Sequence, residues 1–271
     1  MIRDSNGTRN TLFSEYQAID LTLTIDERYP MTFPPHVPFV RRVWNWFEED
    51  QHGPEITMSL CGPYFTELLM MDEHIGTHFD AAAHFIQKHA PGGPDPRCGD
   101  EVPIEDLCGN AVVIDVRHVV SLEPGVSAFI EPDLVIKAEK ELGRSLASGD
   151  VVLFRTDWDA LYYKAGLEGR AYTYKVVVTR EAPGWPAPNV PCMQYLFDRG
   201  IKCVGIDAPS MGASHDGAPV HVYGLGAGML FIESLGNLSQ LPLDGAAFQF
   251  FPIKVARSSG GPGRAIAWVK R

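Results

Sequence analysis

Three histidines and an aspartate crowd into one short stretch of this chain, His74-Ile-Gly-Thr-His-Phe-Asp-Ala-Ala-Ala-His84. A strand has a side-chain period of two, so it would place His74, His78 and Asp80 on one face. A turn would also bring them together, and Gly76 has the backbone freedom to make one. A long regular helix fits less well, because glycine is a poor helix former. The segment is therefore expected to lie on extended or turning backbone.

This spacing predicts a metal site. His74, His78 and Asp80 offer two nitrogens and one oxygen and leave coordination positions open, as a catalytic metal requires. A lone histidine is more often an ordinary core or surface residue, but the crowding reverses that preference here. Outer partners usually orient ligating imidazoles. Asp72 and Glu73 are candidates for that role, and an exposed acidic pair explains them equally well.

The same residues resemble a known motif, His-x-Gly-Thr-His-x-Asp-x-Pro-x-His-Phe, of the cyclase family. That family includes bacterial kynurenine formamidase and isatin hydrolase. The matching residues here are His74, Gly76, Thr77, His78, Asp80, His84 and Phe85. Ala82 stands where the family usually has proline. The change is expected to loosen the turn after Asp80, and it removes no ligand, so it bears on substrate identity more than on metal binding.

A second part of the resemblance lies far downstream. In binuclear members of the family, a histidine followed twelve residues later by a glutamate completes the metal centre, and His221 and Glu233 have that spacing. Judged alone, these two residues could equally be structural. The resemblance, which runs from about Ile19 to the C-terminus, implies one or two divalent ions per subunit. Mixed imidazole and carboxylate ligands suit zinc and manganese alike.

The resemblance also implies a reaction. It predicts hydrolysis of a C–N amide bond, either in an N-formyl arylamine such as N-formylkynurenine or in a cyclic amide such as isatin. A bound metal ion lowers the pKa of water to about 7. His84 is assigned proton transfer to the leaving nitrogen, as in the family, a role worth roughly 10²–10⁴-fold in rate.

Two other functions remain open at this point. One is a polyketide-type cyclase or dehydratase that uses the same metal as a Lewis acid. The other is a non-catalytic metal- or ligand-binding protein, against which the retained His84 argues.

Apolar patterning predicts a mixed α/β fold. Residues 18–24 alternate as in a half-buried strand, and the continuous apolar runs at 111–116 and 151–154 are typical of strands covered on both faces. Residues 132–142 have helical spacing and are followed by Gly143, a common C-terminal stop. The resemblance implies a single domain over residues 1–271 with a three-layer β/β/α architecture of the swivelling type. Residues 1–16 are expected to be a flexible segment.

A proline-rich N-terminal arm is predicted at residues 29–39, which contain four prolines. In relatives a Trp/Tyr-Pro element near the N-terminus contacts substrate, and Tyr29 followed by Pro30 occupies the corresponding place. Trp44 and Trp46 add aromatic surface nearby. Each is more easily explained as packing when taken singly. Together they favour an apolar or aromatic small-molecule substrate.

Charge and cysteine usage limit the partners. The net charge of −11 argues against nucleic acid and anionic membrane surfaces, which require a basic face. The sequence contains no uninterrupted apolar stretch of about 20 residues that could span a membrane. Five scattered cysteines suit a reducing compartment, so the protein is expected in the cytoplasm. The resemblance further implies a homodimer or a larger assembly such as a homotetramer.

Overall fold

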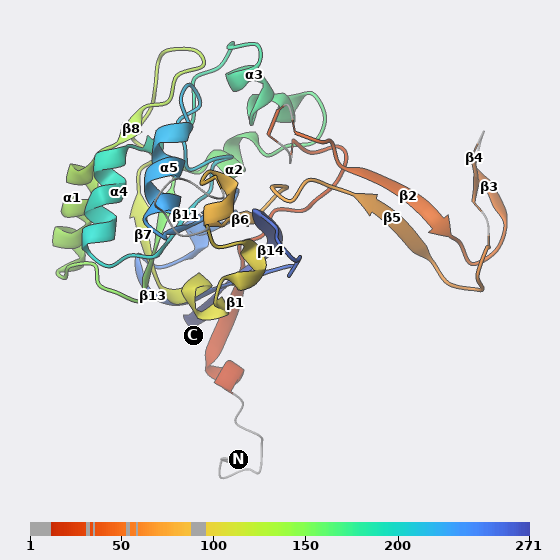
Figure 1. Cartoon of the computed structure of the whole chain (residues 1–271), viewed down its shortest axis with the longest axis horizontal. Helices are drawn as coiled ribbons and strands as arrows, with labels where there is room; N and C mark the ends of the chain where they lie inside the picture. The colour runs from red at the N-terminus through yellow and green to blue at the C-terminus, as the bar shows by residue number, and fades with distance from the viewer. Residues whose placement is uncertain (1–11, 31–32, 35, 53–54, 58, 88–95) are drawn as a thin grey trace, which may run out of the picture.

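The main sheet of the computed structural model curls until one edge strand pairs with the second strand from the other edge (Figure 1). The structure describes residues 12–30, 33–34, 36–52, 55–57, 59–87 and 96–271. The strands of the main sheet are β1 (Tyr16–Asp20), β6 (His78–Asp80), β7 (Cys108–Asp115), β9 (Asp150–Arg155), β11 (Cys203–Ile206), β12 (Leu230–Glu233), β13 (Asp244–Pro252) and β14 (Gly260–Lys270).

The pairing of these strands closes a barrel. Within the described residues the order is β1-β14-β13-β7-β9-β11-β12-β6, and β6 pairs with β14 as well as with β12. Strands β7, β9, β11 and β12 run parallel, and the remaining pairs are antiparallel. The predicted mixed α/β class is confirmed. The three-layer β/β/α arrangement is not confirmed, because a single sheet closes on itself instead of forming two stacked β layers.

Helices cover one side of this sheet. Helices α1 (Pro132–Leu142), α4 (Val190–Asp198) and α5 (Ala218–Gly226) pack in that order beside one another (Figure 1). The predicted helix at 132–142 is confirmed; Pro132 occupies its first turn, and Gly143, with φ of 70°, ends it. The shorter elements are α2 (Trp158–Tyr162), α3 (Tyr174–Val177), the strand pair β8 (Phe129–Ile130) and β10 (Ala187–Pro188), and the 3₁₀ turns η1 (Leu12–Glu15), η2 (Ala82–His84), η3 (Gly99–Glu101), η4 (Ile104–Leu107), η5 (Glu168–Ala171) and η6 (Leu238–Gln240).

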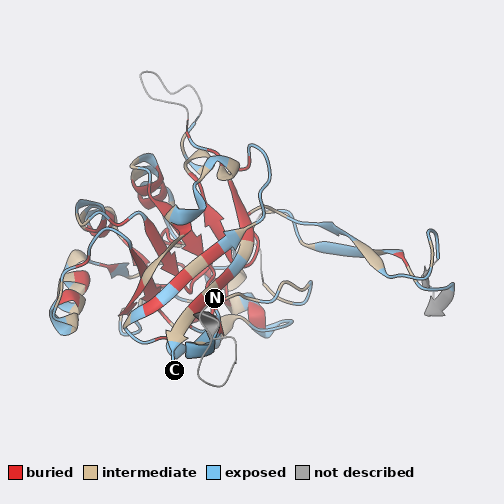
Figure 2. Cartoon of the chain, turned by 90° about the horizontal axis from the view of Figure 1, so that it is seen from below, coloured by how far each residue is buried: buried red, intermediate tan, exposed pale blue. Residues whose placement is uncertain are grey.

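Each face of the sheet has its own apolar core (Figure 2). In β7, Val112 and Ile114 pack toward the helices, whereas Ala111 and Val113 point into the barrel. This strand is therefore apolar along its length because both faces are covered, as its continuous apolar run predicts. None of the described helices is long and apolar enough to cross a membrane.

A ribbon of residues 40–70 projects from this body (Figures 1 and 2). It consists of β2 (Val40–Asn45) paired with β5 (Thr66–Met70), and β3 (Asp50–His52) paired with β4 (Glu55–Thr57). Asn45 is fully buried within the ribbon, where its Oδ1 accepts from the backbone nitrogens of Leu60 and Cys61 at 2.7 and 2.9 Å. Many apolar side chains of the ribbon are exposed, among them Trp44, Phe47, Leu60, Phe65, Leu68, Leu69 and Met70.

The N-terminal segment is described in part. Of the segment 1–16 expected to be flexible, residues 1–11 lie outside the described residues. Residues 12–15 form η1, and Tyr16 begins β1, which pairs with β14 along its whole length. The last residues of that segment are therefore part of the fold, because β1 extends the main sheet.

Candidate metal centre

Strand β6 and the turn before it position the first set of candidate ligands. His78 and Asp80 lie on one face of β6, while Phe79 between them points into the barrel core. Gly76 precedes them with φ of 56°, the left-handed conformation that glycine adopts without strain. This turn brings His74 back to the same face, with its Nδ1 2.8 Å from Oδ1 of Asp80. The structure thus brings together the three residues that the motif predicts as ligands.

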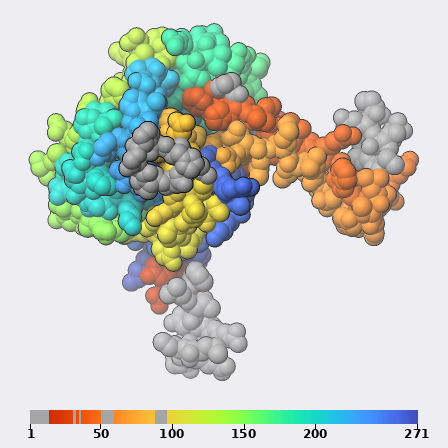
Figure 3. Space-filling model, in the orientation of Figure 1, coloured from red at the N-terminus to blue at the C-terminus, as the bar shows by residue number. Residues whose placement is uncertain are grey.

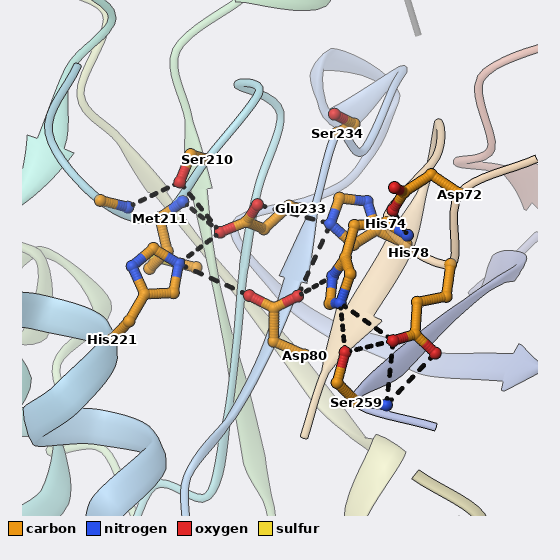
Figure 4. Close-up of polar contacts among 12 residues, drawn as sticks. Asp72, His74, His78, Asp80, Ser210, Met211, His221, Glu233, Ser234 and Ser259 are labelled. Carbon is orange, nitrogen blue, oxygen red and sulfur yellow. Dashed lines mark hydrogen bonds and ion pairs between the residues drawn. The ribbon is translucent and has the colours of Figure 1, made fainter. Parts of the chain in front are cut away.

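His221 and Glu233, the downstream pair of candidate ligands, lie beside the same aspartate, Asp80. His221 lies on α5, and Glu233 ends β12, directly opposite His78 in the β12–β6 register. Among the described residues, two groups could hold a metal ion, His74/His78/Asp80 and Asp80/His221/Glu233, with the ligand atoms of each group within 4.8 Å of one another. Asp80 is common to both and lies between them (Figure 4). All five residues are buried.

Outer hydrogen bonds fix the direction of two of these imidazoles. Nδ1 of His78 lies 2.8 Å from the carbonyl oxygen of Gly76, and Nδ1 of His221 lies 2.7 Å from that of Gly217. A carbonyl oxygen can only accept, so both Nδ1 atoms carry a hydrogen. In the neutral rings, Nε2 therefore presents its lone pair to the centre, which is the form that ligates metals.

These lone pairs face carboxylate oxygens. Nε2 of His78 lies 3.6 Å from Asp80 and 3.5 Å from Glu233, and Nε2 of His221 lies 3.1 Å from Glu233. Within the described part of the chain, the buried Oδ2 of Asp80 makes no short hydrogen bond, and Nε2 of His221 lies 3.5 Å from it. Acceptors that face one another in a buried space need positive charge between them. A divalent cation supplies that charge, and the donor set of nitrogens and oxygens fits one.

Protonation is the other way to neutralise this cluster. Burial opposes charge on His221, but its hydrogen bonds with Asp80 and Glu233 outweigh burial and raise its pKa to about 10. Burial likewise opposes charge on His78, and the same two carboxylates raise its pKa to about 8. Hydrogen bonds with His221 and His74 overcome burial and hold the pKa of Asp80 well below its ordinary value. The carboxylates therefore stay ionised and attract either protons or a metal ion.

His84 sits beside the centre in η2, which begins at Ala82, the position where the family motif has proline. Its ring stacks on that of His74, with centroids 3.8 Å apart. Burial lowers the pKa of His84 to about 4 despite the nearby Asp80 carboxylate. At neutral pH this imidazole is uncharged and able to accept a proton.

A cavity of about 390 Å³ opens beside these residues. Aromatic rings form much of its wall, and polar groups from the loop before α5 line another part. The lining includes His84 and the four candidate ligands His74, His78, His221 and Glu233. Its further lining residues include Phe33, His36, Phe85, Tyr172, Trp185, Ser210 and His215.

The structure does not bring the predicted substrate-binding residues to this cavity. Tyr29 stacks on Tyr163, and only its neighbour Pro30 is among the lining residues. Trp44 lies on the projecting ribbon with 57% of its surface exposed, and Trp46 packs against Phe65 there. Within a single chain these residues do not line the cavity, and their role in substrate binding stays a prediction. The ribbon that contains both tryptophans, built on the pairing of β2 with β5, stands away from the body (Figure 3).

The sequence did not predict the aromatic side chains that line the cavity. Phe33, Tyr172 and Trp185 come from three separate segments, and neither spacing nor motif connects them. Phe85 was visible as part of the motif, although without a role. It stacks on His221 with ring centroids 4.4 Å apart.

Comparison with known proteins agrees with this geometry. The model of the Cyclase family matches residues 19–213. The chain belongs to the cyclase family. Isatin hydrolase of Roseibium aggregatum is 31% identical over 218 residues, which cover 78% of this chain and 77% of that protein.

Solved structures extend the comparison over nearly the whole cyclase-family fold. Isatin hydrolase A from Labrenzia aggregata, bound to benzyl benzoate, has a TM-score of 0.73 at 28% identity and covers 95% of both chains. Isatin hydrolase A from Ralstonia solanacearum has a TM-score of 0.71 at 26% identity, covering 94% of this chain and 92% of that one. The family resemblance inferred from the sequence is confirmed.

Proposed function

We propose that this cyclase-family member is a metal-dependent hydrolase that cleaves a C–N amide bond of a small aromatic substrate. The observation that carries the proposal is the pair of ligand groups sharing Asp80, set beside an uncharged imidazole at one end of an aromatic cavity. The isatin hydrolase relatives support the same reaction class.

The ligand roles follow from the two groups. His74, His78 and Asp80 would hold one divalent ion, and Asp80, His221 and Glu233 would hold a second where two are bound. When bound, such an ion lowers the pKa of water from about 16 to about 7 and polarises a carbonyl oxygen. Either zinc or manganese suits these donors.

His84 moves the proton. It is not in either ligand group, its imidazole is uncharged at neutral pH, and it lines the cavity. It would accept the proton of the attacking water and deliver it to the leaving nitrogen of the amide. Stacking on His74 restricts the tilt of its ring, so the accepting nitrogen stays in place through both transfers.

The cavity walls select the substrate. Phe33, Phe85 and Trp185 present flat apolar surface, which suits an aryl ring. A cyclic amide fused to a benzene ring, such as isatin, fits this composition, as does an N-formyl arylamine. The volume of about 390 Å³ is in the range of small-molecule sites.

A small substrate panel tests the proposal. The protein loaded with manganese or zinc is incubated with isatin, N-formylkynurenine and a cyclic imide, and carboxylate release is followed, with Asp80→Ala as the matched control. We expect turnover of at least one substrate that disappears in the variant. Tight metal binding without hydrolysis of any of them would contradict the proposal and favour the cyclase or dehydratase alternative, which would be seen as loss of water from a polyketide-type substrate.

A further inference from the structure

Ser259, which is outside the two ligand groups, lies against the ring of His74 (Figure 4), and it is hydrogen-bonded in turn to Glu73. Nε2 of His74 lies 2.8 Å from the hydroxyl of Ser259. That hydroxyl donates to Oε1 of Glu73, and the backbone nitrogen of Ser259 lies 3.2 Å from both carboxylate oxygens of Glu73. His74, Ser259 and Glu73 therefore form one series of hydrogen bonds that starts at the ring nitrogen of His74 not facing Asp80.

The number of available hydrogens decides which atom donates in each of these hydrogen bonds. An ionised carboxylate only accepts, so the single hydroxyl hydrogen of Ser259 is used on Glu73. The Ser259 oxygen is then left as an acceptor toward His74, whose Nε2 must carry a hydrogen. In the neutral ring, Nδ1 is thereby left with its lone pair, as a metal ligand requires; the hydrogen bond from Nδ1 to Oδ1 of Asp80, 2.8 Å away, forms only when the ring carries both hydrogens. His74 therefore carries its outer hydrogen on Nε2, whereas His78 and His221 carry theirs on Nδ1.

The backbone holds Ser259 in this position. Ser259 directly precedes β14, whose first residue, Gly260, pairs with Asp80. The carbonyl oxygen of Ser259 accepts a hydrogen bond from the backbone nitrogen of Ala81 at 2.9 Å. A Cβ on Gly260 would lie 2.2 Å from the carbonyl oxygen of Phe79 and 2.8 Å from Cε1 of His74. Only glycine allows the two segments to approach this closely. The close strand contact therefore places the Ser259 hydroxyl against the imidazole.

We propose that Ser259 and Glu73 are positioning residues that fix the tautomer and orientation of His74 for metal binding. The proposal rests on the metal centre of the proposed function and extends it to residues that touch no ion. The side chain of Glu73 is 42% exposed, so it is not needed to fill the core. Outer partners of this kind are typically worth 10–100-fold in metal affinity.

Four variants separate this role from simple packing. Ser259→Ala removes the acceptor, Ser259→Thr keeps a hydroxyl, and Glu73→Ala removes the carboxylate that accepts the serine hydrogen. Ser258→Ala is the matched control, because Ser258 is the buried neighbour and its hydroxyl has no hydrogen-bond partner within the described residues. Zinc affinity is measured by competition with a fluorescent chelator. We expect a loss of about 10–100-fold for Ser259→Ala and Glu73→Ala, near-wild-type affinity for Ser259→Thr, and no change for Ser258→Ala.

A second measurement does not depend on metal. In protein labelled with ¹⁵N-histidine, we expect the His74 ring to show a slowly exchanging hydrogen on Nε2 that is retained in Ser258→Ala and lost in Ser259→Ala. Absence of that hydrogen in the wild type, or unchanged zinc affinity in Ser259→Ala, would overturn the proposal. Failure of the wild-type protein to bind zinc or manganese would instead contradict the proposed function, while the ring measurement still decides the role of Ser259.

Discussion

The imidazole of His84 lies flat against that of His74, with ring centroids 3.8 Å apart and 25° between the ring planes. One ring belongs to a candidate ligand group and the other does not. Stacking thus holds the proposed proton carrier in place without using either of its nitrogens. Binding of metal and transfer of protons are therefore assigned to neighbouring residues that can be tested separately.

Substitution of His84 should separate chemistry from metal binding. We expect His84→Ala to keep its metal content and lose about 10²–10⁴-fold in kcat, the usual contribution of a general base. Asp80→Ala should lose the metal, because Asp80 is shared by both ligand groups. Metal analysis beside kinetics of both variants makes the comparison. Equal metal loss in the two would show that His84 is a ligand.

Removal of metal should make stability fall as pH rises. The folded protein raises the pKa of His78 to about 8 and of His221 to about 10. For a histidine whose pKa is raised by folding, the stabilisation is complete below its unfolded pKa of about 6.5 and is lost as pH rises through the folded value. The Tm of chelator-treated protein should therefore drop between about pH 6.5 and about pH 10.

The metal-loaded protein should behave differently, because the ion replaces those protons. Its Tm should change less over the same range, and metal binding near neutral pH should release protons, roughly two if both histidines are charged beforehand. Calorimetry in buffers of different ionisation enthalpy measures that release. Parallel pH profiles of the loaded and chelator-treated protein, with no proton release, would contradict the assignment of these residues as ligands.

Local sequence predicted the part of the site that local backbone builds. His74, His78 and Asp80 are brought together by the turn at Gly76 and the two-residue period of β6, and both features are visible in one short segment. The pairing of that segment with Glu233 depends on the register between β6 and β12, which no local pattern encodes. Only the family resemblance connected these residues before the structure was known.

For the fold, too, the sequence predicted local elements but not long-range strand pairing. Strand and helix patterns gave the mixed α/β class and the bounds of α1, because burial on both faces and helix termination are local signals. Closure of the barrel depends on the pairing of β14 with β6, for example of Gly260 with Asp80, which are 180 positions apart in the chain. The outward course of the ribbon, which contains Trp44 and Trp46, is not encoded by any local pattern either.

The aromatic wall should contribute binding rather than chemistry. Phe33 packs edge-on against Trp185, with ring centroids 6.2 Å apart, and both line the cavity. An aromatic contact of this kind is worth about 0.5–1.5 kcal/mol. We expect Phe33→Ala to raise KM for an aromatic amide by about 2–10-fold with little change in kcat. A non-aromatic amide serves as the control substrate and should be unaffected; an equal rise in its KM would indicate a general change in cavity shape.

From the exposed ribbon we predict that the protein is not a monomer in solution. An isolated two-stranded ribbon is marginally stable in water, and here Leu68 and Trp44 are 58% and 57% exposed. Because the ribbon is present in every molecule, a second copy of the chain is the partner always available to cover it. We therefore expect light scattering to give a mass of at least twice 29.9 kDa.

A charged substitution on the ribbon should weaken that assembly. Leu68→Glu would place charge on the apolar ribbon, whereas Leu122→Glu is a matched control at a side chain that is 93% exposed on the body. We expect the first variant to shift toward monomer and the second to keep the wild-type mass. Because His74, His78, Asp80, His221 and Glu233 all lie outside the ribbon, the monomeric variant should still bind metal. A monomeric wild type, or no difference between the two variants, would show that the ribbon has another role.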